Sequence, residues 1–149
     1  MTFERGKSYD ELVLGEEAAF SKTITETDVV LFAGLSGDFN PIHMDEEYAR
    51  QTPFKRRIAH GALPQSLIAP VLGMKLPGPG TIVVEIRCRF KAPTYFGDTI
   101  TAKATVAEKI TEKKRVRMAL TWTNQRGETI ADGEALVILP PAALKFSPP

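Results

Sequence analysis

An aspartate and a histidine, Asp38 and His43, lie five residues apart in a loop-forming stretch of this 149-residue chain. Asn40 and Pro41 stand between them, and both residue types favour a tight turn. Such a turn can bring the carboxylate and the imidazole onto one water molecule. Adding water to a double bond needs this pairing, because one group takes a proton while another holds or returns one. Histidine suits the task because its ordinary pKa lies near neutral pH.

The same residue types are also common where no chemistry occurs. Aspartate and asparagine beside glycine and proline often only shape a turn, so both interpretations of Asp38 and His43 stay open at this level. His60 is the only other histidine of the chain. These three residues follow no metal-ligand spacing, so we expect no metal. We expect His60 to pack or to hydrogen-bond at the start of a helix, with a direct catalytic role as the alternative.

The composition is typical of a soluble globular protein, with 43% hydrophobic and 25% charged residues. The length fits one domain, residues 1–149, with a proline-rich tail over 140–149 that we expect to be loosely ordered. A net charge of +1 gives no field that attracts nucleic acid or an anionic membrane. The first eleven residues are charged and unlike a secretory signal, and no apolar stretch is long enough to span a bilayer. Together with the single cysteine, Cys88, these features favour a cytoplasmic protein without an intramolecular disulfide.

The front half of the chain is expected to position the Asp38 loop. A strand over 17–24 comes first, and then Thr25 followed three residues later by Asp28 indicates a helix start. Apolar residues at helical spacing from 29 to 35 predict a buried helix face, which Gly34 and Gly37 are expected to end. A short helix over about 45–51 follows the loop.

The stretch from 61 to 74 predicts the most buried helix of the chain, since it has little polar surface. Pro64 is compatible with a first helical turn, where its missing N–H has no partner. Pro70 lies inside the helix and removes one hydrogen bond, so we expect a bend there. Leu63, Leu67 and three further apolar residues form the core side: Ile68, Val71 and Leu72.

The back half alternates apolar and polar residues, which is typical of half-buried strands. Turn residues at Phe96-Gly97-Asp98 and Gln125-Arg126-Gly127 make a largely antiparallel sheet the expected arrangement. A last strand runs over about 128–139. The sheet and the apolar helix each have one apolar face, so an α+β fold with a curved sheet wrapped around a central helix is predicted. The predicted inward-facing residues are Ile82, Val84, Ile86, Cys88, Phe90, Ile100, Ala102, Ala104, Val106, Val116, Met118, Leu120 and Trp122.

The segment 32–49 resembles the hydratase motif of the MaoC-like (R)-specific enoyl-CoA hydratases. The resemblance continues through Ile58-Ala59-His60-Gly61, Ser66 and the strand over 83–93. It ends with Gly97-Asp98 and Gly133-Glu134-Ala135, and so covers nearly the whole chain. The resemblance implies a single hot-dog fold that dimerises through its sheet edges. It also implies an enzyme of fatty acid metabolism, a hydro-lyase that performs reversible syn hydration of trans-2-enoyl-CoA to (R)-3-hydroxyacyl-CoA, with no cofactor beyond the coenzyme A of the substrate.

Five positions match functional residues of the family motif. Asp38 and His43 match the catalytic pair, although which of them is the formal base stays open. Asn40 matches an asparagine that supports the loop and the pair. The backbone N–H of Gly61, at a helix start, matches the donor that receives the thioester oxygen. Ser66 matches a polar residue near the pair.

Candidate substrate contacts come from two groups of residues. Lys55, Arg56 and Arg57 stand before the central helix and could meet the phosphates of coenzyme A, although such a run is more often a solvated loop. Arg87, Arg89 and Lys75 compete for that role. Four apolar residues near the motif could line an acyl tunnel, and ordinary packing explains them equally well. They are Phe32, Leu35, Leu63 and Leu67.

Two other functions stay open on the same fold. A hot-dog acyl-CoA thioesterase would attack the carbonyl carbon rather than the β carbon, and the paired Asp38 and His43 speak against it. A non-catalytic subunit that binds acyl thioesters is the second alternative, although the chain has every motif residue. The length of the acyl chain, the choice between coenzyme A and acyl-carrier protein, the pathway and the assembly beyond a homodimer stay open.

Overall fold

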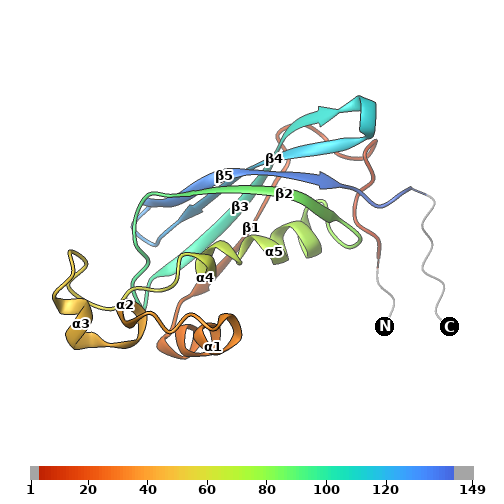
Figure 1. Cartoon of the computed structure of the whole chain (residues 1–149). Coiled ribbons are helices and arrows are strands. Elements are labelled where there is room, and N and C mark those ends of the chain that lie inside the picture. Colours follow the sequence, from red (N-terminus) through yellow and green to blue (C-terminus); the bar gives the residue numbers. More distant parts are fainter. Residues whose placement is uncertain (1–3, 143–149) are drawn as a thin grey trace.

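The computed structural model describes residues 4–142, which form one antiparallel five-stranded sheet in the order β1-β3-β4-β5-β2. The sheet curves over the helices of the central segment (Figure 1). This arrangement confirms the predicted α+β fold. The strands are β1 (Glu17–Thr23), β2 (Ile82–Phe90), β3 (Thr99–Ile110), β4 (Arg115–Thr123) and β5 (Thr129–Ile138).

The central helical segment is more broken than the single bent helix that the sequence predicts. It consists of α4 (Ala62–Gln65), α5 (Ile68–Pro70) and a π-helical turn η1 (Val71–Lys75). Pro70 has no N–H to give to the carbonyl of Ser66, which instead accepts the Ala69 N–H at 3.0 Å. The helix therefore has a 3₁₀-type hydrogen bond before Pro70 and a π-helical turn after it. The predicted core side is buried at Leu67, Ile68, Val71 and Leu72, whereas Leu63 is half-buried.

The interior strands β3 and β4 supply most of the buried sheet surface. Their side chains alternate between the core and the outside, as the sequence pattern predicts. Trp122 has no exposed surface and is the largest of the fully buried side chains among the described residues. All eight predicted inward-facing residues of these strands are at most 2% exposed: Ile100, Ala102, Ala104, Val106, Val116, Met118, Leu120 and Trp122.

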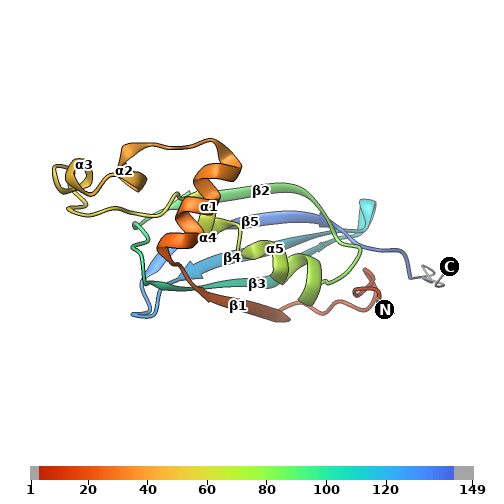
Figure 2. The ribbon, with the colours of Figure 1, turned by 90° about the horizontal axis from the view of Figure 1, so that it is seen from below.

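Strand β2 departs from the prediction in two ways. It lies at one edge of the sheet, opposite β1 (Figure 2), and the central helix contacts β1 and β3 instead. Its apolar side chains are therefore exposed rather than buried. A bulge between Val83 and Glu85 also reverses the alternation, so Ile82 lies on the opposite face from Ile86. The exposed apolar residues are Ile82, Val83, Val84, Ile86 and Phe90, with Cys88 half-buried.

Three short helices precede the central segment: α1 (Glu26–Ser36), α2 (Pro41–Met44) and α3 (Glu46–Arg50). Thr25 and Asp28 form the predicted capping box at the start of α1. Gly37, with φ of 79°, ends α1, whereas Gly34 lies inside it and ends nothing. The predicted apolar face is only partly covered, because Val29 and Ala33 are buried while Val30, Leu31 and Leu35 are exposed.

Of the expected tail, the structure describes residues 140–142. Pro140 is buried beside Gly80, and the next two residues are exposed. The remainder of the expected tail, 143–149, lies outside the described residues. A single 3₁₀ turn, η2 (Thr111–Lys113), separates β3 from β4. Within 4–142 no helix has the length and hydropathy that a membrane crossing requires.

Candidate active site

The loop between α1 and α2 has the turn that the sequence predicts. The N–H of Asn40 donates to Oδ1 of Asp38 at 3.1 Å, and Oδ1 of Asn40 accepts the N–H of Ile42 at 3.2 Å. Asn40 thereby caps α2, whose first residue is Pro41. These bonds fix the backbone between Asp38 and the start of the helix that contains His43. Asn40 thus holds the turn through both its N–H and its side chain.

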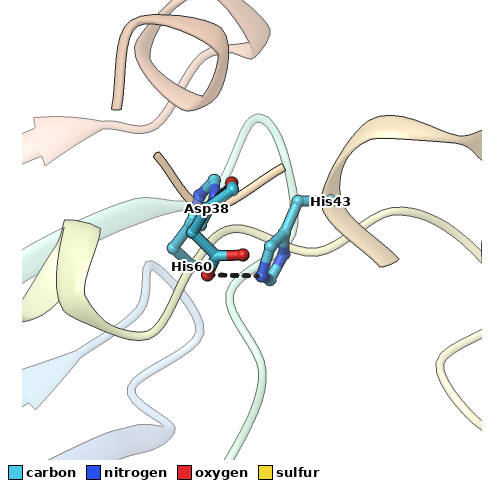
Figure 3. A group of neighbouring side chains, drawn as sticks. All are labelled: Asp38, His43 and His60. Atoms are coloured by element: carbon cyan, nitrogen blue, oxygen red, sulfur yellow. Dashed lines mark hydrogen bonds and ion pairs between the residues drawn. The ribbon is translucent and has the colours of Figure 1, made fainter. Parts of the chain in front are cut away.

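The side chains of Asp38 and His43 face each other across this turn (Figure 3), with Oδ2 of Asp38 at 3.9 Å from Nε2 of His43. That separation is too long for a direct hydrogen bond and suits a water that both atoms hold. His43 is 8% exposed, and its Nδ1 lies 2.8 Å from the carbonyl of Ile58. A carbonyl only accepts, so Nδ1 carries the proton and Nε2 presents a lone pair to Asp38.

Burial lowers the pKa of His43 below its ordinary value of about 6.5. The hydrogen bond to Ile58 acts in the opposite direction, His60 lowers the pKa further, and Asp38 raises it. The net result is a neutral imidazole at neutral pH. The lone pair on Nε2 is therefore available to accept a proton.

His60 lies directly behind the pair. It is 2% exposed, and its Nε2 is 2.8 Å from the backbone carbonyl of Asp38. Its ring stacks on that of His43, with 3.9 Å between ring centroids and 35° between ring planes. This matches the expectation that His60 packs and hydrogen-bonds at the helix entry. One potential ligand atom from each of Asp38, His43 and His60 lies within 4.8 Å of the others.

Gly61 stands at the start of α4, next to the pair, and has an ordinary helical φ of −56°. Within the described chain no acceptor takes its backbone N–H. A methyl group at this position would lie 3.0 Å from the ring of Phe90, so glycine is needed for close packing rather than for an unusual φ. The Gly61 N–H is therefore free to bind an oxygen.

A cavity of about 310 Å³ opens beside these groups. Its lining is mostly apolar and includes His43 and Gly61, so the imidazole and the free N–H border one space. The sequence analysis did not identify most of the other lining residues, because they come from three segments that only the fold brings together. They are Phe54, Ile58, Ala59, Pro64, Phe90, Lys91, Ala92, Pro93, Thr94 and Ile130.

The apolar residues expected to line an acyl tunnel do not line this cavity. The Phe32 ring packs against His60, 5.0 Å between centroids, and Leu63 packs on the core. Leu35 is 85% exposed on the outer side of α1. Ser66 also lies away from the cavity, where its hydroxyl donates to the Leu63 carbonyl at 2.6 Å and is exposed. The expectation that Ser66 lies near the pair has no support in its contacts.

The three basic residues before the central helix have different environments. Arg57 bridges α1 and α3 through Glu26 at 2.5 Å and Glu46 at 3.4 Å, so its guanidinium is already paired. The guanidinium of Arg56 lies 4.0 Å from the centroid of the Tyr95 ring. Lys55 is exposed. Lys91, which the sequence analysis did not single out, lines the cavity and pairs with an acid of β5, Asp132.

A single antiparallel sheet wrapped around a central helix is the hot-dog fold. The family described as "MaoC like domain" matches residues 12–126, and the chain belongs to this family.

Three similar proteins are named as hydratases or dehydratases. An "(R)-specific enoyl-CoA hydratase" of Rhodospirillum rubrum is 48% identical over 89% of this chain and 91% of its own length. A "3-hydroxybutyryl-CoA dehydratase" of Methylorubrum extorquens is 44% identical over 89% of this chain and 83% of its own. The solved structure of the unliganded R-hydratase PhaJ1 from Pseudomonas aeruginosa superposes with a TM-score of 0.86, at 42% identity over 97% of this chain and 96% of that one.

Proposed function

We propose that the chain is a hydro-lyase that adds water to a trans-2-enoyl-CoA to give the (R)-3-hydroxyacyl-CoA, and that catalyses the reverse dehydration. The observation that supports this most directly is the pair Asp38 and His43, whose facing atoms are 3.9 Å apart, with His43 lining an apolar cavity. The two curated relatives described above, named as a hydratase and a dehydratase, support the same reaction.

In this proposal one water molecule donates its two hydrogen bonds to Asp38 and His43. Its oxygen attacks the β carbon of the enoyl group, while Nε2 of His43 takes one of its protons. The imidazolium that forms faces the carboxylate of Asp38, which stabilises it. The same proton then moves to the α carbon, so one O–H bond and one C–C π bond are replaced by a C–O bond and a C–H bond. Because one water supplies both groups, the addition is syn.

The attack moves negative charge onto the thioester oxygen, which needs a donor. In this proposal the free N–H of Gly61 is that donor, since it borders the same cavity as His43. Losing such a donor typically costs about 3–4 kcal/mol of transition-state stabilisation. No metal or other cofactor has a role, so a chelator is expected to leave the rate unchanged.

One basic residue in the cavity lining and two that follow a lining residue in sequence support a coenzyme A thioester as substrate. Lys91 lines the cavity, and Lys55 and Arg56 follow Phe54, another lining residue. Arg57 is a weaker candidate, because both of its ion pairs would have to break before it could meet a phosphate. Comparing crotonyl-CoA with crotonyl-acyl-carrier protein tests this choice, and equal kcat/KM for the two would contradict it.

The direct test is to mix the protein with crotonyl-CoA and to follow both the enoyl absorbance and free thiol. Loss of the absorbance without thiol, with the (R)-3-hydroxy product, is expected. Release of thiol would identify a thioesterase instead, and binding without turnover would identify a non-catalytic subunit. Either result would overturn the proposal.

Variants test the assigned pair. Asp38→Asn and His43→Ala are each expected to lower kcat by about 10²–10⁴-fold while the fold is kept. Asp45→Asn is a matched control, because Asp45 caps α3 with its side chain and asparagine caps equally well. The activity of the wild type is expected to fall with decreasing pH only below about 6.5, since His43 acts as its neutral form and its pKa is lowered. An activity loss centred above pH 7 would contradict His43 as the base.

The assembly belongs to the same proposal. We expect a homodimer in the cytoplasm, formed through the edge strand β2. This strand presents Ile86 and Phe90 at 38% and 55% exposure, an unusual amount of apolar surface for a sheet edge. Light scattering after size exclusion is expected to give twice the 16.4 kDa mass of the chain. A monomer at micromolar concentration would contradict it.

A further inference from the structure

His60 connects the separate parts of the candidate active site. Its N–H at Nε2 donates to the main-chain carbonyl of Asp38, and its ring stacks on His43. It is also the residue immediately before Gly61, and its own carbonyl accepts the N–H of Leu63 at 3.0 Å in the first turn of the helix. The buried side chain of His60 therefore contacts both members of the pair, and its main chain is bonded directly to Gly61, the proposed oxyanion donor.

The second ring nitrogen of His60 has an unusual environment. Nδ1 is buried and has no hydrogen-bond partner in the described chain. A residue that only filled space here would not need a nitrogen at that position, and burying one without a partner is unfavourable. The cost of burying Nδ1 without a partner is explained if the site requires the N–H at Nε2, on the other side of the ring.

The unpartnered Nδ1 also indicates which ring nitrogen of His60 carries the proton. A proton there would place a second N–H in a buried site without an acceptor, next to the imidazole of His43. Asp38, from the loop, and His43, from α2, are titratable groups close to the ring, and Phe32 of α1 packs against it. The arrangement therefore favours a proton on Nε2, which faces the carbonyl of Asp38, over one on Nδ1.

We propose that His60 is a positioning residue for the hydration reaction: its Nε2–H holds the main chain of Asp38, and its ring packs against His43 and holds that base in place. This inference rests on the proposed function for its kinetic consequences. Its structural prediction does not depend on that function, because it specifies one tautomer for each of the two histidines of the chain.

Two variants separate the contributions of the N–H and the ring. His60→Gln keeps an N–H donor near the position of Nε2 and loses the aromatic stack. His60→Phe keeps an aromatic ring and loses the donor. A displacement of about 1 Å in a catalytic group can lower a rate by about 10²-fold, so we expect His60→Phe to lower kcat by about that factor. We expect His60→Gln to lower kcat less than about tenfold, with KM nearly unchanged in both.

The pH profile distinguishes positioning from a purely structural role. His60 lowers the pKa of His43, so removing it in His60→Phe is expected to raise that pKa and to move the acid limb of kcat/KM to higher pH. A residue that only packed would leave the limb in place. Wild-type kcat and an unshifted limb in folded His60→Phe would overturn the inference.

Imidazole nitrogen NMR of the wild-type protein tests the same inference without any turnover. The expected spectrum at neutral pH has His43 protonated on Nδ1 and His60 protonated on Nε2, and His60→Gln assigns the two signals. A His60 protonated on Nδ1 would overturn the inference even if the enzyme is active. A wild-type protein that hydrates no enoyl thioester would instead refute the proposed function, and the tautomers would still be measurable.

Discussion

Strands β4 and β2 have the same length, nine residues, and both alternate apolar with polar side chains over most of it, yet only one of them is buried. Leu120 of β4 is 1% exposed, whereas Ile86 of β2 is 38% exposed. Strand β4 has a neighbour on each side, while β2 pairs only with β5 at the sheet edge. Alternation therefore predicts which side chains share a face, and the position in the sheet decides whether that face is covered.

The buried and the exposed strands also contribute to different properties of the protein. The covered strands β3 and β4 form the core that stabilises the fold. The uncovered strand β2 ends at Phe90, which touches Gly61 and lines the cavity. Part of the candidate active site is thus formed by the least buried strand of the sheet.

The largest expected effect comes from replacing one large apolar residue with alanine in each of the two strands. Leu120→Ala is expected to lower the free energy of unfolding by about 2–5 kcal/mol, independently of protein concentration, because the cavity it leaves is fully buried. Ile86→Ala is expected to cost the isolated chain less than about 1 kcal/mol and to weaken the proposed dimer. Urea unfolding at several protein concentrations measures both. Equal, concentration-independent losses would show that the two strands do not differ.

The pairing of β2 with β5 depends on a glycine. A methyl group on Gly133 would lie 1.9 Å from the carbonyl oxygen of Arg87, so Gly133→Ala is expected to push β2 away and to cost about 3 kcal/mol. Gly34→Ala is the matched control. Gly34 lies inside α1 with open space around it, so alanine there is expected to stabilise by about 0.5–1 kcal/mol. Thermal unfolding with opposite signs for the two variants is the expected result.

A smaller effect is expected at two aspartates, one just before the buried strand β3 and one on β5 opposite the edge strand β2. Asp98, before β3, is buried and accepts from Gln125 at 2.8 Å and Arg126 at 3.0 Å. Burial alone would raise the pKa of Asp98, but hydrogen bonds from Gln125, the Tyr95 N–H and Arg126 lower it below its ordinary value. Asp132, on β5 opposite the edge strand, makes only an exposed ion pair with Lys91.

Asp98→Asn is therefore expected to cost about 2 kcal/mol at pH 7, and Asp132→Asn less than about 1 kcal/mol. The contribution of Asp98 is fully present above its unfolded pKa of about 4 and is lost as the pH falls through its lower folded pKa. The difference between wild type and Asp98→Asn should accordingly disappear in acid. A difference that persists at pH 2 would assign the effect to packing rather than to charge.

Much of the fold follows from local signals in the sequence. The capping box of Thr25 and Asp28, and the alternation of β3 and β4, each depend on residues close in the chain, so they can be predicted. The exposure of β2 could not, because strand order is a property of the whole sheet. The bulge after Val83 was missed for a related reason: nothing in a run of three apolar residues shows which two share a face.

The candidate site divides in the same way. Asp38 and His43 are neighbours in sequence, and their turn residues predict that they approach each other. The cavity was not predictable, since Phe54, Phe90 and Thr94 meet only after folding. Arg57 is a case in which the sequence pattern was misleading. The run of basic residues that contains it suggests a free cation, but in the fold Arg57 pairs with Glu26 and Glu46.

The smallest effect concerns the single cysteine. Cys88 lies on β2 opposite Gly133 and is half-buried, and burial raises the pKa of its thiol, with Asp132 raising it further. Because the thiolate is the reactive form, alkylation by iodoacetamide at pH 7.5 is expected to be several-fold slower than in the urea-unfolded chain. If β2 forms the dimer edge, the rate should fall again as protein concentration rises, and Ile86→Asp, which disfavours association, should remove that dependence. A slow rate that is already independent of concentration in the wild type would mean that the edge strand is shielded within one chain, and the proposed interface would have to lie elsewhere.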